Sequence, residues 1–166
     1  MKKIIAIALL CAALCLCFVA CGGDEDKGDN AAQRDIYNIV YNGVNIKLGD
    51  NAASVIDKLG EATSVKEIGD CGGFGAQVKY TYPSVVVYTL KNDEGETIDQ
   101  IDLLDDIVTT PEGIYIGSPA SDVESKYGEA DSVTDSAIIY NDGNCFLKFG
   151  IKNGEVVSVS ILRETN

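Results

Sequence analysis

The chain has 166 residues, enough for one domain of ordinary size with a hydrophobic core. It carries 26 acidic against 13 basic residues, a formal net charge of −13, so its surface should repel nucleic acid and anionic lipid. It has no histidine, which excludes the Ser-His-Asp arrangement and removes the usual general base and most zinc ligand sets. We therefore expect no catalytic residues, metal or cofactor. The charge most simply serves solubility, although it leaves a cationic partner open.

The N-terminus has the pattern of an export signal: two lysines, an apolar run over residues 4–20, and then Cys21. The run approaches the roughly 20 residues of a spanning helix, so an uncut anchor and an ordinary secretory signal are the alternatives. Phe18 to Cys21 (Phe-Val-Ala-Cys) resembles the lipobox of bacterial lipoproteins. That resemblance implies a signal peptide over 1–20, cleavage before Cys21, and a covalent diacylglycerol with acyl chains such as palmitate on Cys21. Two acyl chains anchor a protein stably, which predicts an extracytoplasmic location at the cell membrane or cell envelope.

Residues 21–33 are mostly glycine and charged or polar residues, which predicts a flexible acidic tether before a folded part that begins near Arg34. Two cysteines, Cys71 and Cys145, lie in this folded part. In an exported protein they can pair, and a disulfide closing so long a loop would stabilise the fold by about 4 kcal/mol. Two free, buried thiols are the alternative.

Short stretches rich in Val, Ile and Tyr alternate with turn residues, which is typical of antiparallel strands. The expected strands cover 36–41, 44–48, 77–82, 85–91, 97–104, 137–140, 145–151 and 156–162. Asn-Gly pairs at 42–43 and 153–154 are strong signals for two-residue hairpin turns. In the last stretch Val157, Val159 and Ile161 alternate with serines, so these three side chains should face the core.

An internal repeat runs through the chain at an offset of 68 residues, and nine of the 17 positions in 49–65 recur in 117–133. Each copy predicts a two-turn helix with one apolar face, which ends at Gly60 or Gly128. Asp50 and Ser118 are the expected N-caps. Helices this short are not stable alone and must pack on something else.

A strand ending in Leu-Gly-Asp or Ile-Gly-Ser, a short helix, a Gly-Glu pair and a strand meander follow one another in both copies. This order resembles the β-lactamase-inhibitor-protein-like repeat, and also the small lipoproteins of outer-membrane assembly, which carry one such unit. The resemblance covers most of 44–162. It implies an α+β fold of two tandem repeats, 34–108 and 109–166, each a short helix packed on an antiparallel β-meander. It also implies one curved joint sheet, and binding to other proteins rather than catalysis.

Aromatic residues are the candidates for a binding face, because tyrosine combines contact area with a polar tip. They are Tyr80, Tyr82 and Tyr88 in the first copy and Tyr140 and Phe146 in the second. The alternative is that most of them belong to the core or the sheet flanks.

Two other segments stand out. The glycine-rich stretch 69–75 has no counterpart in the second copy; it lacks the Gly-Lys-Ser/Thr of a phosphate loop, and a simple connector is the alternative to a functional insertion. Asp99, Asp102, Asp105 and Asp106 form an acidic cluster without the spacing of a calcium loop, which predicts a solvated acidic edge.

The sequence therefore predicts a lipid-anchored envelope protein that is not an enzyme. It predicts a protein-binding module with the membrane and an unidentified protein as partners, and no nucleic acid. A structural role in envelope assembly or maintenance is the alternative. A hydrolase that uses carboxylates of the acidic cluster is a third hypothesis.

Overall fold

The computed structural model describes residues 35–70 and 75–164. The expected signal peptide, the tether, Cys21 and Cys71 lie outside these residues, so the predictions that concern them remain predictions. The chain divides into residues 1–33 and 34–166, and the fold below belongs to the second of these units.

Helices and antiparallel strands make up the described part, so the fold is α+β, as the sequence predicts. In chain order its elements are β1 (Asn38–Tyr41), β2 (Val44–Lys47), α1 (Ala52–Leu59), β3 (Ser64–Asp70), β4 (Ala76–Thr81), β5 (Val85–Asn92), β6 (Gly95–Leu103), α2 (Ala120–Tyr127), β7 (Ser132–Thr134), β8 (Ala137–Asn141), β9 (Cys145–Lys152) and β10 (Glu155–Arg163). Eight strands form one sheet in the order β3-β4-β5-β6-β10-β9-β8-β7, while β1 and β2 pair separately. The strands that follow α1 therefore meet those that follow α2 at the central β6–β10 pair.

Turn chemistry explains several boundaries. Both Asn-Gly hairpins are confirmed: Asn42 and Asn153 have φ of 50° and 56°, and each following glycine also has a positive φ. Gly60 and Gly128 end the helices at φ of 77° and 83°, a region that favours glycine because it has no Cβ.

The predicted N-caps are wrong by one residue. Asn51, not Asp50, caps α1, and its Oδ1 accepts a hydrogen bond of 3.0 Å from the backbone N–H of Ser54. Pro119 occupies the N-cap position of α2, while the hydroxyl of Ser118 accepts from the backbone N–H of Tyr115 at 3.0 Å. Ser118 therefore orders the segment before the helix instead of the helix itself.

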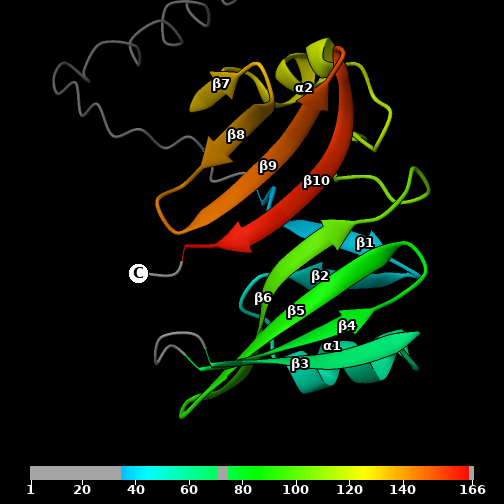
Figure 1. Cartoon of the computed structure of the whole chain (residues 1–166), viewed down its shortest axis with the longest axis vertical. Helices are drawn as coiled ribbons and strands as arrows, with labels where there is room; N and C mark the ends of the chain where they lie inside the picture. Colours follow the sequence, from blue (N-terminus) through cyan, green and yellow to red (C-terminus); the bar gives the residue numbers. More distant parts are fainter. Residues whose placement is uncertain (1–34, 71–74, 165–166) are drawn as a thin grey trace, which may run out of the picture. The chain divides into compact units, whose positions relative to one another are not determined.

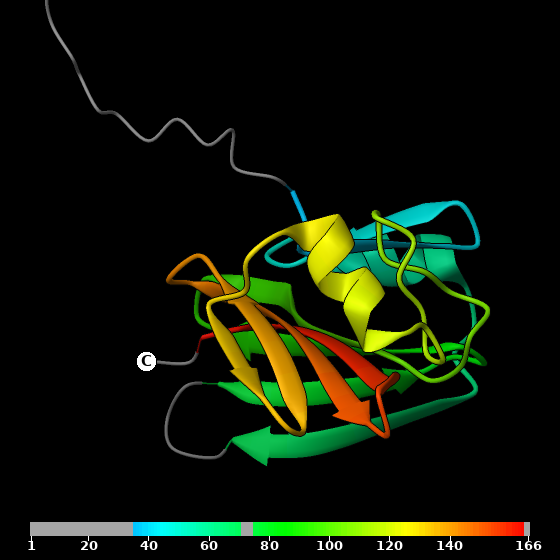
Figure 2. The ribbon, with the colours of Figure 1, turned by 90° about the horizontal axis from the view of Figure 1, so that it is seen from above.

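Figure 2 shows that α1, α2 and the β1–β2 hairpin all lie on the same side of the eight-stranded sheet. The main core fills the space between them. One row of this core crosses seven strands, each residue opposite the next: Val65, Tyr80, Val87, Ile101, Ile161, Leu147 and Tyr140. All of these except Val65, which is on the edge strand β3, are buried in the core or packed against it. We call this side of the sheet the covered face.

The alternation predicted for β10 is correct at Val159 and Ile161 and wrong at Val157. A β-bulge between Val156 and Ser158 shifts the register, so Val156 is buried and Val157 is 48% exposed. One extra residue in the strand therefore moves the side chains that precede it in β10 to the opposite face of the sheet.

In Figure 1 the eight-stranded sheet runs from β3 at one edge to β7 at the other. Neither edge strand is among the strands expected from the sequence, because their residues are exposed and their pattern does not alternate. Neither helix of the described residues is long and apolar enough to cross a membrane.

Candidate binding face

The sheet has a second face, opposite the helices, which we call the helix-free face. Two rows of residues define it, each residue lying opposite the next on the neighbouring strand. The first row is Lys66, Lys79, Tyr88, Gln100, Leu162, Phe146 and Asn141. The second row is Ser64, Thr81, Val86, Asp102, Ser160, Lys148, Ile139 and Ser132. Both rows alternate with the core row along the strands, so their side chains point away from the helices.

Apolar side chains occupy the middle of the helix-free face. Tyr88, Leu162, Phe146 and Ile139 are half-buried and come from β5, β10, β9 and β8, respectively. Val86 is only 3% exposed, although Figure 2 shows no described helix or hairpin on this side of the sheet. The neighbouring side chains of the face itself must therefore account for its burial. Apolar area with no covering element is typical of an interaction surface.

The strand β6 is the polar exception within this apolar middle. The Gln100 side-chain amide donates to Asp102 Oδ1 at 2.9 Å, and the Gln77 amide donates to Asp99 Oδ2 at 3.0 Å. Asp99 lies at a bulge in the β5–β6 pairing and is only 5% exposed. Its burial raises the pKa of this carboxyl, while the hydrogen bond from Gln77 and the positive charge of Arg163 act in the opposite direction.

The acidic cluster is consequently not the uniform solvated edge that the sequence predicts. Asp99 is buried, Asp102 is half-buried and Asp105 accepts a hydrogen bond from the backbone N–H of Ile107, so only Asp106 is simply exposed. Across residues 35–70 and 75–164, no group of three His, Cys, Asp or Glu residues could hold a metal ion.

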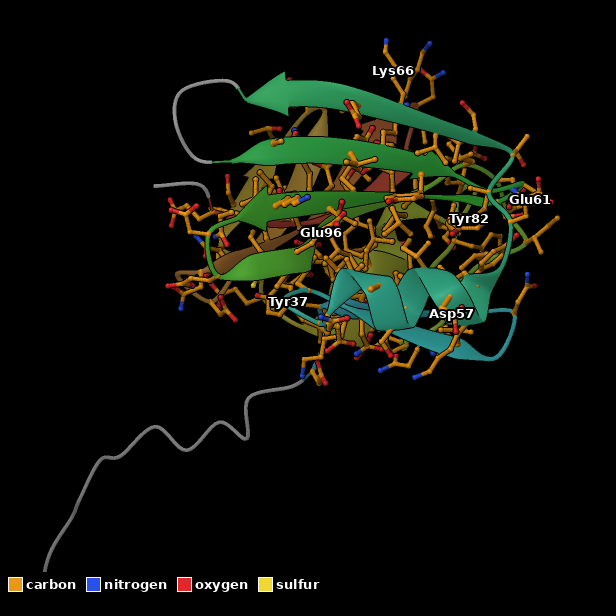
Figure 3. All side chains as sticks on the ribbon, turned by 90° about the horizontal axis from the view of Figure 1, so that it is seen from below. Tyr37, Asp57, Glu61, Lys66, Tyr82 and Glu96 are labelled. Carbon is orange, nitrogen blue, oxygen red and sulfur yellow. The ribbon has the colours of Figure 1, made fainter. Side chains whose placement is uncertain are left out.

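Three lysines belong to the helix-free face. Lys79 places its Nζ 5.6 Å from the centroid of the Tyr88 ring, a cation–π contact between neighbouring strands. Lys148 is exposed on β9, and Lys66 is exposed on the edge strand β3. Figure 3 shows Lys66 extending away from α1, in agreement with its place in the row.

Of the five predicted binding residues, the structure brings Tyr88 and Phe146 to the helix-free face. The prediction is wrong for Tyr82 and Tyr140, which are 3% and 5% exposed within the core. Tyr140 also donates its hydroxyl hydrogen to the Gly128 carbonyl at 3.0 Å and packs against the Phe149 ring. Tyr80 lies opposite Val87 in the core row, so it too belongs to the covered face.

Leu162 and the three lysines of the two rows are not among the binding residues expected from the sequence. The signal was available in the strand period of two: once Ile161 is assigned to the core, Leu162 must point the other way. The same count from Leu147 places Phe146 and Lys148 on the helix-free face. Aromatic content alone gave the wrong face for Tyr80, Tyr82 and Tyr140, because it ignores this parity.

Cys145 is half-buried at the start of β9, opposite Arg163. Burial raises the pKa of its thiol, and the charge of Asp142 raises it further against the opposing influence of Arg163 and Lys47. The predicted pairing with Cys71 stays a prediction, because Cys71 lies outside the described residues.

A scan against protein-family models and searches of curated proteins and of solved structures found no match for this chain.

Proposed function

We propose that the chain is a lipid-anchored envelope protein that binds another protein, without catalysis, through the helix-free face. The observation that carries the proposal is the one-sided covering of the sheet. Helices and a hairpin cover one face, while the other presents Tyr88, Leu162 and Phe146 with no described element over them. A patch of aromatic and aliphatic side chains with a polar and charged surround fits the composition of protein interfaces.

The proposal includes two tandem helix-plus-meander repeats. Several observations support it: α1 and α2 begin 68 residues apart, at Ala52 and Ala120, which is also the offset of the sequence repeat. In both, the glycine after the helix donates its backbone N–H to a helix carbonyl, at 3.1 Å for Gly60 and 2.8 Å for Gly128. Four strands follow each helix, and the last strands of the two sets pair with each other.

The lipid anchor rests on the lipobox-like Phe-Val-Ala-Cys at 18–21 and on the polar composition of 22–33. Under this proposal the acylated Cys21 holds the chain at the membrane on the extracytoplasmic side. The tether then lets the folded unit move over the membrane surface to reach a partner.

Metabolic labelling with an alkyne-bearing palmitate in a bacterial host tests the anchor. We expect the wild-type chain to incorporate the label and to fractionate with membranes, and a Cys21→Ser variant to lose the label. Equal labelling of both chains would contradict lipidation at Cys21.

Site-specific photo-crosslinking in envelopes tests the binding face. A photoreactive residue at position 148 lies on the helix-free face, whereas one at Asp57 lies exposed on α1 (Figure 3). We expect one discrete crosslinked protein from position 148, lost on Phe146→Ala, and none from position 57. Equal crosslinking from both positions would overturn the assignment of the face. A deletion that weakens the envelope, without crosslinks from either position, would favour the structural role instead.

A further inference from the structure

The charges of the chain are distributed unevenly between its surfaces. Its net charge is −13, and acidic residues are exposed on both helices, with Asp57 on α1 and Asp122 and Glu124 on α2. Among the described residues of the two rows that define the helix-free face, three are lysines and one is an aspartate, Asp102. These two rows therefore have the opposite charge balance from the chain as a whole.

The carboxylates near this face are also engaged within the protein. Asp102 accepts a hydrogen bond from Gln100, and Asp99 is 5% exposed and hydrogen-bonded to Gln77. Burial raises the pKa of Asp99 above its usual value.

We propose that the occupant of the helix-free face is an acidic segment of the partner protein, with apolar side chains between its carboxylates. The carboxylates would pair with Lys79 and Lys148, with Lys66 adding to the field at the sheet edge, and the apolar side chains would contact Tyr88, Leu162 and Phe146. The inference rests on the proposed binding function and specifies the chemistry of the partner. It is the reverse of the cationic partner that the net charge leaves open.

The strand order sets the spacing of this segment. Lys79 on β4 and Lys148 on β9 are four strand steps apart, which corresponds to about 19 Å at the usual spacing of neighbouring strands. An extended segment covers that distance with about six residues. Tyr88 on β5 and Leu162 on β10 lie between the strands of the two lysines, and Phe146 shares β9 with Lys148, so the partner needs apolar side chains between its acidic ends. An anionic polysaccharide or polyphosphate has acidic groups without those side chains, and the apolar middle of the face therefore favours a protein.

Fluorescence anisotropy with labelled peptides and the purified full-length chain in mild detergent tests the proposal. The probes are ten-residue peptides with an apolar centre, one carrying glutamates at both ends and one carrying lysines there, together with polyglutamate and polyphosphate. We expect the acidic apolar peptide to bind and the basic one not to bind. Tighter binding of the basic peptide, or no binding of any probe at millimolar concentration, would overturn the inference.

Charge-matched variants separate the local field from the net charge. Lys79→Gln with Lys148→Gln removes two positive charges from the helix-free face, and Lys58→Gln with Lys126→Gln removes two from the exposed surfaces of α1 and α2. We expect about a tenfold loss of peptide affinity for the first pair and less than about a twofold change for the second, with urea unfolding confirming that both fold. Equal losses would mean that the net charge, not the face, governs binding.

The remaining outcomes distinguish this inference from the binding function on which it rests. Polyglutamate or polyphosphate binding as tightly as the acidic apolar peptide would assign an anionic polymer to the face and overturn the protein segment. Preference for the basic peptide, together with a discrete crosslink from position 148, would leave the binding module standing and overturn only its acidic partner. Because a photoreactive residue at position 148 replaces Lys148, absence of that crosslink together with no binding of any probe to the wild-type chain would remove the binding function itself.

Discussion

The two faces of the eight-stranded sheet use the same strands for different purposes. On β9, Phe149 is 0% exposed and packs against the rings of Tyr127 and Tyr140, whereas Phe146, three residues earlier, is half-buried on the helix-free face. Both residues are phenylalanines, but they lie an odd number of positions apart, so their side chains point to opposite faces of the sheet. An aromatic residue therefore packs into the core or remains at the surface according to the face on which the strand places it.

The largest expected effect contrasts these two phenylalanines. Phe149→Ala should lower the free energy of unfolding by about 3–5 kcal/mol, because it removes a fully buried ring and leaves a cavity among aromatic neighbours. Phe146→Ala should lower it by about 1 kcal/mol or less, because no described element packs over that ring. Urea unfolding of both variants, followed by circular dichroism, measures the difference.

Equal decreases in the free energy of unfolding for the two variants would contradict the difference between the faces. Such a result would mean that Phe146 is as well packed as Phe149 in solution, and the helix-free face would not be available to a partner. Phe146→Leu provides the control, since it keeps most of the apolar volume and should leave the free energy of unfolding nearly unchanged.

Local patterns predicted the elements of this fold well. Asn-Gly pairs located two hairpin turns, and Gly60 and Gly128 located the helix ends, because each signal depends only on the backbone conformation of one or two residues. The edge strands β3 and β7 were not predicted, because a strand with no buried face needs no alternation of apolar and polar residues.

The face of each side chain was harder to predict, because it depends on register and on what lies above the sheet. Tyr82 and Tyr140 are of the residue type expected at a binding face, but their side chains are buried in the core. The bulge beside Val157 exchanges the faces of the first residues of β10. The bulge at Tyr88/Thr89 leaves Asp99 without a partner residue in the β5–β6 pairing, and Asp99 is buried there. Bulges are set by the pairing of two strands, so neither strand alone contains the signal.

An intermediate effect concerns Asp99, which lies buried beside the helix-free face. Its raised pKa means that the folded state holds a proton more tightly than the unfolded state, where the usual value is 3.8. The wild-type chain therefore loses stability as the pH rises from 3.8 through the higher folded pKa. Asp99→Asn keeps an acceptor for Gln77 and has no charge to bury, so it should raise the free energy of unfolding by about 1 kcal/mol at pH 7.

The pH dependence distinguishes this explanation from a general gain in packing. The advantage of Asp99→Asn should shrink as the pH falls through the folded-state pKa and vanish well below 3.8, where the wild-type carboxyl is protonated in both states. Asp102→Asn is the matched control, since Asp102 is less buried and should show a smaller change. A gain that is constant from pH 7 to pH 3.5 would show that desolvation of the charge at Asp99 is not its cause.

The smallest expected effect tests whether the helix-free face is organised before a partner arrives. The Lys79 Nζ lies 5.6 Å from the Tyr88 ring centroid, so a double-mutant cycle with Lys79→Met and Tyr88→Leu should give a coupling of about 0.5 kcal/mol in urea unfolding. Lys66 lies two strands from Tyr88, and the same cycle with Lys66→Met should give a coupling near zero. A measurable coupling for Lys79 alone means that this lysine and this ring already hold each other in the free protein. Less side-chain entropy is then lost on binding, whereas a zero coupling would make the face a set of independent side chains that a partner must order.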